Sequence, residues 1–478
     1  MFDKVLIANR GEIALRVARA CRELGVATVA VYSTEDRDSQ VVRYADEAVH
    51  IGPGAARASY RNIAAVVEAA RQTGAQAIHP GYGFLSEDAD FAEVCAQNDI
   101  VFIGPPAHVI AQLGDKCAAR RVMSEVGLPV LPGSHGPVVS AEEATALLAE
   151  IGYPAIFKAA AGGGGRGMAV VAEPREVVTA YQGVTSESLA VFGDGRIYVE
   201  RYVAAARHIE VQVLCDGHGN GVHLGLRDCS VQRRHQKLLE ESPAPGLSAH
   251  TADRMGQAAV AAALAVGYVG AGTFEFLVDE DERFYFMEAN CRIQVEHPVT
   301  EAVTGVDLVQ QQLRVAAGER LALRQADVVP RGAAIECRIN VENPDRDFAP
   351  APGVFDEFVV PGGPFVRVDT HGYPGYRMPA IYDSLIAKII VWAPDRAAAI
   401  ARMDRALAEF RATGRAIHTT AGFLRRVLAE HTFRDGTHTT TLVGHILHDL
   451  AGRPAGPAAT RPEEGAPRWA RKHPVPHS

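Results

Sequence analysis

The sequence contains few cysteines, and none of them has the spacing of a metal or redox motif. The seven cysteines lie at positions 21, 95, 117, 215, 229, 291 and 337 and form no Cys-x-x-Cys pair. An odd count without paired spacing argues against a disulfide framework and against a structural zinc site. The pattern is typical of a reducing compartment, and we expect a cytoplasmic protein.

Long apolar runs and excess positive charge are also missing. No stretch reaches the roughly 18 apolar residues of a membrane span. The first residues, MFDKVLIANRGE, lack the layout of a signal peptide and predict a first strand instead. Lys and Arg number 48 against 57 Asp and Glu, which gives a formal net charge of -9. An acidic surface argues against general nucleic-acid binding. We therefore expect neither a membrane nor a nucleic acid as partner.

Two common nucleotide fingerprints are absent as well. The first predicted strand is followed by Asn9-Arg10-Gly11-Glu12 without a GxGxxG sequence, so dinucleotide binding is unsupported. The glycines at 162–165 are not followed by Lys-Ser or Lys-Thr, so they do not form a Walker A loop.

What is present is an ordinary globular composition. Of 478 residues, 47% are hydrophobic and 22% charged, and this length favours several domains. Short apolar runs alternate with helical patterns through the first hundred residues, which predicts a parallel α/β sheet. The strands are expected at 4–8, 27–32, 48–51, 77–78 and 100–103, and the helices at 11–25, 60–73 and 88–97. The loop 79–84 is either a ligand loop at the sheet edge or a plain Pro-Gly turn.

The densest group of reactive side chains lies in 288–298, EANCRIQVEHP, directly after the apolar run 284–287. If this stretch is extended, every second side chain shares one face. That face would carry Glu288, Asn290, Arg292, Gln294 and Glu296. A solvated strand edge is the plain alternative, but the apolar lead-in disfavours it. We predict metal ligands, an anion clamp and a carboxylate base in one row.

A second carboxylate supports a metal in this region. Glu275 lies among apolar neighbours in 272–278, GTFEFLV, where an unpaired carboxylate is costly. Across a hairpin it would face Glu288, and the pair suits Mg²⁺, which prefers hard oxygen ligands.

The glycines at 162–165 lie between strands expected at 151–157 and 168–172, with Lys158 on the entering strand. Successive backbone N–H groups can bind an anion, and the missing side chains allow close approach, so we predict a mobile loop that closes over phosphates. A flexible linker is the alternative.

Further along the chain, a strand at 197–203 carries Glu200, and 208–214 alternates like a half-buried strand. Gln232, His235 and Lys237 are spaced to converge on one anion, although a surface charge cluster is the alternative. Lys116 lies on a predicted helix that Asp115 caps, and without further context such a lysine is expected to be a solvated charge. Helices are expected at 305–318, 396–411 and 420–431, strands at 333–341, 354–360, 366–369 and 384–391, and a disordered Pro- and Arg-rich tail from 451.

Seven motifs in order resemble those of biotin carboxylases of the ATP-grasp superfamily, over residues 1 to about 450. They are LIANRGEIALRV, IHPGYGFLSE, KAAAGGGGRGM, RDCSVQRRHQK, GTFEFL, RIQVEHPVTE and ECRIN. The resemblance implies α/β and α+β architecture, with a Rossmann-like N-terminal domain at 1–114 and an ATP-grasp region at 115–330. It also implies a lid at 131–203, a mixed C-terminal domain at 331–450 and a tail at 451–478.

The resemblance also implies the reaction. ATP activates bicarbonate to carboxyphosphate, and biotin held on a carrier protein is carboxylated. Arg292, Glu296, Lys237 and Arg338 would be catalytic, with Glu296 as the base, and Mg²⁺ would be held by Glu275, Glu288 and Asn290. ATP, bicarbonate and biotin would contact Lys116, Lys158, Gly164, Gly165, Glu200, Arg201, Tyr202, Val203, His208, Gln232, His235, Gln294, Val295 and Tyr82.

Some residues depart from the family pattern. Ala159-Ala160-Ala161 stands where a serine and a fifth glycine are usual, and a positive φ at Ala161 would cost on the order of 1 kcal/mol. Arg201 replaces a common lysine, while Ala289 and Cys291 should point away from the chemistry. No catalytic group is lost, so we expect an active enzyme.

Two other functions compete with this one: an ATP-grasp ligase acting on another carboxylate, and a non-catalytic carboxylase subunit. The RIQVEHP and ECRIN motifs disfavour the first, and the complete catalytic set disfavours the second. No biotin-attachment sequence is present, so we expect the carrier protein and the carboxyltransferase on separate chains, and a homodimer through Arg19 and Glu23. The acceptor is left open between acetyl-CoA or another acyl-CoA, as in fatty acid biosynthesis, and pyruvate or another 2-oxoacid.

Overall fold

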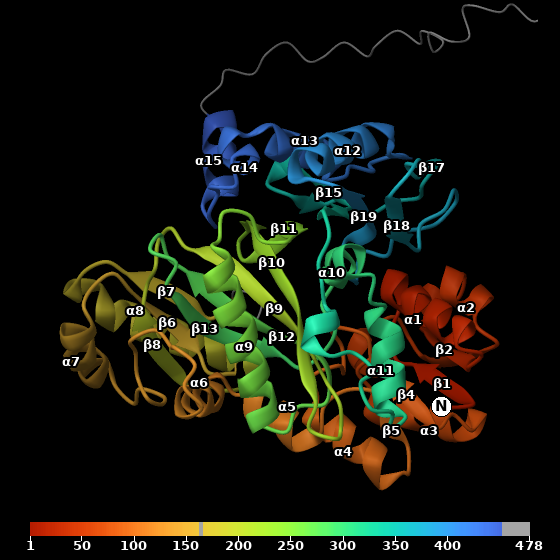
Figure 1. Ribbon diagram of the computed structural model, residues 1–478, viewed down its shortest axis with the longest axis horizontal. Coiled ribbons are helices and arrows are strands. Elements are labelled where there is room, and N and C mark those ends of the chain that lie inside the picture. The colour runs from red at the N-terminus through yellow and green to blue at the C-terminus, as the bar shows by residue number, and fades with distance from the viewer. Residues whose placement is uncertain (162–165, 452–478) are drawn as a thin grey trace, which may run out of the picture.

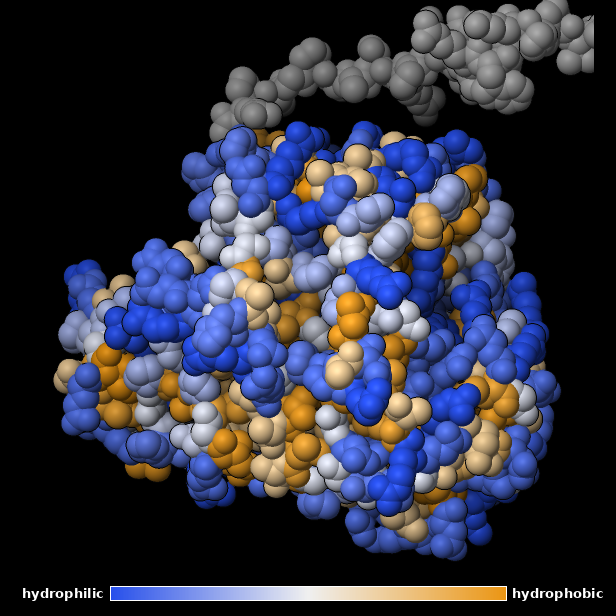
Figure 2. Space-filling model, viewed as in Figure 1, coloured by the Kyte–Doolittle hydropathy of each residue, from blue (hydrophilic) through white to orange (hydrophobic). Residues whose placement is uncertain are grey.

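The computed structural model describes residues 1–161 and 166–451. Gly164, Gly165 and the tail from 452 lie outside the described residues. An N-terminal part, the segment predicted to be a lid and a C-terminal part surround one large central sheet (Figure 1). On the face seen in Figure 2, hydrophilic residues cover most of the C-terminal part, and apolar residues are interspersed below it. No helix among the described residues has both the length and the apolar character needed to cross a bilayer.

The N-terminal part is a five-stranded parallel sheet in the order β3-β2-β1-β4-β5, as the alternation predicted. Leu6 and Ile7 are fully buried in different apolar clusters, so helices cover both faces, as parallel sheets require. Its strands are β1 Lys4–Ile7, β2 Ala27–Ser33, β3 Glu47–Gly52, β4 Ala77–His79 and β5 Val101–Phe102. Its helices are α1 Gly11–Glu23, α2 Gln40–Tyr44, α3 Ile63–Thr73, α4 Ala89–Gln97 and α5 Ala107–Gly114.

The lid is a small antiparallel sheet in the order β7-β6-β8. It comprises β6 Ala155–Ala159, β7 Met168–Val171, β8 Ile197–Arg201, α7 Ala141–Ile151 and α8 Val177–Phe192, and α6 Lys116–Glu125 precedes it. Asp115 caps α6 by accepting the Ala118 N–H, as predicted. The strand expected from 151 begins four residues later, because Ile151 ends α7 and Gly152 turns the chain at φ 88°.

The central sheet is antiparallel and eight-stranded, in the order β13-β12-β9-β10-β11-β14-β19-β18. Its strands are β9 Arg207–Cys215, β10 Gly221–Arg233, β11 Gln236–Ser242, β12 Gly270–Val278, β13 Phe284–Asn290, β14 Ala333–Asn340, β18 Val366–Thr370 and β19 Leu385–Ala393. The helices α9 Ala249–Ala265, α10 His297–Thr304 and α11 Leu308–Ala316 pack around it (Figure 1).

The C-terminal part adds helices and two small ladders. They are β15 Glu342–Asn343, β16 Ala349–Pro350, β17 Glu357–Val359, β20 Arg411–Thr413, α12 Arg396–Glu409, α13 Ala421–Ala429, α14 His431–Arg434 and α15 Leu442–Ala451. The strand predicted at 354–360 is therefore only three residues long.

Two elements at the centre of the chain differ in detail from the expectation. The helix expected at 305–318 is present as α11 but spans only Leu308–Ala316, because Gly305 at φ 73° ends α10 and Asp307 caps α11. Strand β9 is buried on both faces rather than half-buried. Its polar residues Glu210 and Gln212 are covered because the Arg227 side chain binds them both.

Candidate active site

One face of the central sheet carries most of the polar groups. In β14, Ile335, Cys337 and Ile339 pack into the C-terminal core, whereas Glu336 and Arg338 lie on the opposite face. This alternation places Glu336 and Arg338 on one face of the sheet. In β9 and β12, too, the polar side chains lie on one face of the sheet and their apolar neighbours lie on the other.

A bulge in β13 turns the predicted acidic residues toward this face. Glu275 of β12 pairs with Glu288 of β13, as the hairpin predicted. The register then shifts so that Phe276 pairs with Phe286. The extra residue, Met287, lets Phe286 stay in the core while Glu288 keeps its place opposite Glu275.

Lys237 of β11 lies at the centre of the polar face. Its Nζ lies 2.7 Å from Glu210 Oε2, 2.9 Å from Glu275 Oε1 and 2.6 Å from Glu296 Oε1. Burial alone lowers the pKa of Lys237, but Cys229 and the three carboxylates outweigh it and raise that pKa well above its usual value. The ammonium is therefore a fixed positive charge.

Glu296 is fully buried and joins two cations. Besides Lys237, Arg338 donates from Nη2 to Glu296 Oε2 at 2.8 Å, and its Nε lies 2.6 Å from Glu240. Burial raises the pKa of Glu296, but Lys237, Arg338 and Arg227 hold it well below its usual value. Glu296 is thus a carboxylate whose affinity for a proton depends on where these cations point.

The stretch 288–298 is not extended throughout, contrary to the prediction. Strand β13 ends at Asn290, and α10 begins at His297 with Pro298 in its first turn, a position that favours helix. The side chains still converge, because Asn290 Nδ2 and Gln294 Nε2 both donate to Glu275 Oε1 at 3.0 Å. The polar side chains of 288–296 are therefore brought together by the turn between β13 and α10, and not by alternation along an extended strand.

Arg292 lies beside this group. It donates from Nη1 to Gln294 Oε1 at 2.8 Å and from Nε to Glu87 Oε2 at 2.8 Å. Ala289 and Cys291, which were expected to point away, lie in the apolar core as predicted.

The predicted phosphate ligands are held by carboxylates. Lys116 Nζ lies 2.5 Å from Glu288 Oε2, and Lys158 Nζ lies 2.5 Å from Glu200 Oε2. Glu200 is buried and also pairs with Arg120. The Glu200 carboxylate therefore neutralises two cations rather than facing open solvent.

The segment after Glu200 is held mainly by its backbone. Arg201 is exposed, and its N–H donates to Pro132 O at 2.8 Å. The Tyr202 N–H donates to Pro154 O at 2.9 Å, and Val203 follows with a half-buried side chain. The two amides at 201 and 202 are thus already paired.

The β10–β11 hairpin separates its predicted anion ligands. Gln232 pairs with Lys237 across the hairpin, and its Nε2 lies 3.3 Å from His208 Nδ1. His208 Nε2 in turn lies 2.7 Å from Glu275, and although burial lowers the His208 pKa, Glu275 raises it overall. His235 instead occupies the exposed turn at φ 64°.

Tyr82 connects to the site through the N-terminal helix. Its hydroxyl donates to Glu12 of α1, and Glu12 Oε1 lies 3.1 Å from Lys388 Nζ. Lys388 also donates to the Val295 carbonyl oxygen at 2.8 Å.

Sequence reasoning missed several of these partners. Glu210 and Lys388 are single charges within the apolar strands HIEVQVL and LIAKIIVWA, and Arg227 precedes Asp228 in HLGLRDCSV. All three are fully buried, so a charge within an otherwise apolar run was the available signal. Glu87 lies outside any such pattern.

The donor set fits a divalent cation. Glu275 and Glu288 face each other and Asn290 adds an amide oxygen, which gives the hard ligands that Mg²⁺ prefers. Lys116 lowers the pKa of Glu288, so this carboxylate is ionised and ready to bind a metal. Within the described ranges, two further groups hold ligand atoms within 4.8 Å of one another, His208–Glu210–Glu275 and Glu210–Cys229–Glu296.

Three family models match consecutive parts of the chain. The biotin carboxylase N-terminal domain matches residues 1–110, and the ATP-binding domain of the carbamoyl-phosphate synthase L chain matches 115–324. The biotin carboxylase C-terminal domain matches 336–445.

Individual proteins agree with these matches. The chain is 55% identical to a biotin carboxylase of Nostoc sp. over 442 residues, which is 92% of this chain and 98% of the relative. A biotin carboxylase–ATP complex from Campylobacter jejuni aligns with a TM-score of 0.91 and 47% identity, covering 93% of this chain and 99% of that one. A biotin carboxylase domain dimer of 2-oxoglutarate carboxylase from Hydrogenobacter thermophilus, with MgADP and bicarbonate, also gives 0.91 and 47%, covering 94% and 98%.

Proposed function

The chain belongs to the biotin carboxylase family, and from this we infer that it uses ATP and bicarbonate to carboxylate biotin held on a carrier protein. The fold is that of an ATP-grasp enzyme of this family. ATP, Mg²⁺, bicarbonate and biotin are the reactants and cofactor that the family implies.

One observation carries the proposal: two cations converge on the buried Glu296 carboxylate. Lys237 and Arg338 lie 2.6 and 2.8 Å from its two oxygens. Such an arrangement keeps a base ionised until an anion draws the cations away. The pKa of Glu296 then rises, and the carboxylate becomes a stronger proton acceptor where bicarbonate must be deprotonated.

We assign the ATP phosphates to Lys116 and Lys158, whose ammonium groups pair with Glu288 and Glu200. Closure of the 162–165 loop over the phosphates remains a prediction. The adenine is assigned to Glu200, Arg201, Tyr202 and Val203. The ribose and phosphates are assigned to His208, Gln232 and His235.

Glu275, Glu288 and Asn290 would hold Mg²⁺. The ion supplies charge neutralisation at the phosphates when bound. In the structure, Lys237 and His208 contact Glu275, and Lys116 contacts Glu288. A metal ion held by these carboxylates would leave the cations available for substrate anions.

Bicarbonate is assigned to Arg292, Gln294 and the backbone of Val295, next to Glu296. Its hydroxyl proton passes to Glu296, and the resulting oxyanion attacks the γ-phosphorus of ATP while the bond to ADP breaks. This forms carboxyphosphate, whose charge Lys237 stabilises. Decomposition then releases CO₂ and phosphate beside biotin.

Biotin is assigned to the side of Arg338 and Tyr82. Phosphate takes the proton from N1′, and the negative charge that develops on the ureido oxygen is stabilised by the Arg338 guanidinium. Biotin N1′ then bonds to the CO₂ carbon.

Proposed partners are a biotin carboxyl carrier protein and a carboxyltransferase subunit, in the cytoplasm. We favour acetyl-CoA or another acyl-CoA as acceptor, in fatty acid biosynthesis. The alternative is a 2-oxoacid such as pyruvate, and it is supported by the similarity to the Hydrogenobacter protein, whose description names a 2-oxoglutarate carboxylase.

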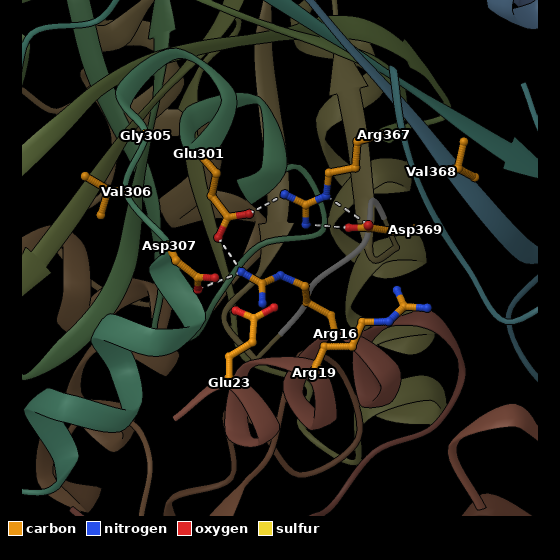
Figure 3. A pocket seen from close by; sticks show the side chains of 10 residues that line it. All are labelled: Arg16, Arg19, Glu23, Glu301, Gly305, Val306, Asp307, Arg367, Val368 and Asp369. Carbon is orange, nitrogen blue, oxygen red and sulfur yellow. Dashed lines mark hydrogen bonds and ion pairs between the residues drawn. The ribbon is translucent and has the colours of Figure 1, made fainter. Parts of the chain in front are cut away.

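We also propose a homodimer through the face around Arg19 and Glu23. These residues line a pocket of about 440 Å³ where Arg16 and Arg367 both point toward Glu301 (Figure 3). The Hydrogenobacter domain is described as a dimer. Val306→Asp in this pocket should shift sedimentation toward monomer, whereas Val139→Asp on the exposed lid should not. Equal sedimentation of both variants would argue against this interface.

The deciding assay measures phosphate release from ATP with bicarbonate and biotin omitted in turn. We expect release to require bicarbonate and to rise with free biotin. Hydrolysis indifferent to both would refute the proposed function. Purification of the chain with its partners and analysis of the carboxylated product would then identify the acceptor.

A further inference from the structure

Lys388 is a fully buried lysine at the junction of three parts of the molecule. It lies on β19 and contacts Glu12 of α1 and the Val295 carbonyl. Asp369 of β18 lies 4.0 Å from its Nζ. The ammonium therefore ties the C-terminal part of the sheet to the N-terminal helix and to the segment between β13 and α10.

The contact to Val295 differs from an ordinary ion pair. Residues 291–296 belong to no strand or helix, so no backbone ladder fixes their orientation. The peptide unit that joins Val295 to Glu296 is planar, so holding the Val295 oxygen also fixes the Glu296 amide and places the Glu296 Cα from which the side chain leaves the backbone. Among the described residues, the Lys388 ammonium is the hydrogen-bond donor to the Val295 oxygen.

The same ammonium reaches the other side of the site. Glu12 accepts a hydrogen bond from Tyr82 while it pairs with Lys388. Burial alone lowers the pKa of Lys388, but Glu12, Glu336 and Asp369 raise it, so the ammonium remains charged. Val295 and Tyr82 are thus held through one buried cation.

We propose that Lys388 is a positioning residue for the reaction. It orients the Val295–Glu296 peptide so that Glu296 faces bicarbonate, and through Glu12 it holds Tyr82. This inference rests on the proposed function. A purely structural role, in which Lys388 only neutralises Glu12, is the competing explanation.

The test compares Lys388→Met with the double variant Lys388→Met/Glu12→Gln. The single variant leaves Glu12 buried without its cation, so its melting temperature should fall. The double variant removes both charges, while its glutamine oxygen still accepts from Tyr82, so its melting temperature should recover. Neither variant has a donor for the Val295 oxygen.

We therefore expect both variants to raise the KM for bicarbonate by on the order of tenfold to a hundredfold, with the KM for ATP within about twofold of wild type. Ile389→Ala, on the opposite, apolar face of β19, is the matched control. It should lower the melting temperature and leave the bicarbonate KM unchanged.

Recovery of the bicarbonate KM in the double variant, or an unchanged KM in the folded single variant, would overturn the positioning role. Failure of both variants to fold would also overturn it in favour of the structural role. If the wild-type chain shows no bicarbonate-dependent hydrolysis, the proposed function falls, and this inference falls with it.

Discussion

Lys237 and Glu296 form a buried ion pair, with Nζ 2.6 Å from Oε1, and each has further partners of opposite charge. Lys237 also contacts Glu210 and Glu275, and Glu296 also contacts Arg338. The pair is therefore the link between the metal side of the site and the biotin side. A change on either side alters the electrostatics of the other.

Glu296→Ala tests the proposed base. Lys237 keeps Glu210 and Glu275 as partners, so the variant should fold and bind ATP with unchanged affinity. Turnover should fall by about a hundredfold or more, since no other group in the pair accepts the bicarbonate proton. Calorimetric ATP binding and phosphate release measure the two effects, and a nearly normal rate would remove Glu296 from the mechanism.

Arg338→Gln should separate the two half-steps. The guanidinium is assigned to biotin, so bicarbonate-dependent ATP hydrolysis should continue while stimulation by biotin is lost. The variant also loses the contacts to Glu240 and Glu296, so some loss of basal rate is expected. Arg411→Gln, at an exposed ion pair with Glu357, serves as the control. Biotin stimulation equal to that of the control would contradict the assignment.

Glu288→Gln should raise the requirement for Mg²⁺. The change removes one of the two facing carboxylates, so the free Mg²⁺ concentration needed for half-maximal rate should increase at saturating ATP. Titration of Mg²⁺ in excess over ATP measures this. Glu280→Gln, in the exposed turn of the same hairpin, should titrate like wild type. Matching titrations for the two variants would count against Glu288 as a ligand.

The stability of the fold should depend on pH through Glu240. Burial and the nearby Glu296 carboxylate raise the pKa of Glu240, Arg338 lowers it, and the net result is a rise from 4.5 to about 7. The folded state therefore holds a proton that the unfolded state releases, and stability is lost as the pH rises from about 4.5 to 7. A shift of this size corresponds to roughly 3 kcal/mol.

Glu240→Gln mimics the protonated form, so its melting temperature should exceed that of wild type by more at pH 8 than at pH 5. Glu150→Gln, exposed at the end of α7, provides the baseline. A difference that does not change with pH would show that Glu240 does not hold this proton.

The sequence predicted the parallel N-terminal sheet, the Asp115 cap and the Glu275–Glu288 pairing, because each rests on local periodicity or on a hairpin. It did not predict that 291–296 leaves the strand, because the helix that begins at His297 depends on packing against β14 and β19. It also missed Glu210 and Lys388, whose partners come from strands distant in sequence. Long-range ion pairs leave no periodic signal beyond a lone charge in an apolar run.

The strand order of the central sheet has a consequence for the covalent chain. Strand β11 pairs with β14, although α9, β12, β13, α10 and α11 lie between them in sequence. The segments before and after residues 317–332 are therefore held together mainly by strand pairing and packing, and little by the covalent connection between them. A protease cut in that connection should leave two fragments that stay associated, and the separately expressed fragments should reassemble by strand complementation.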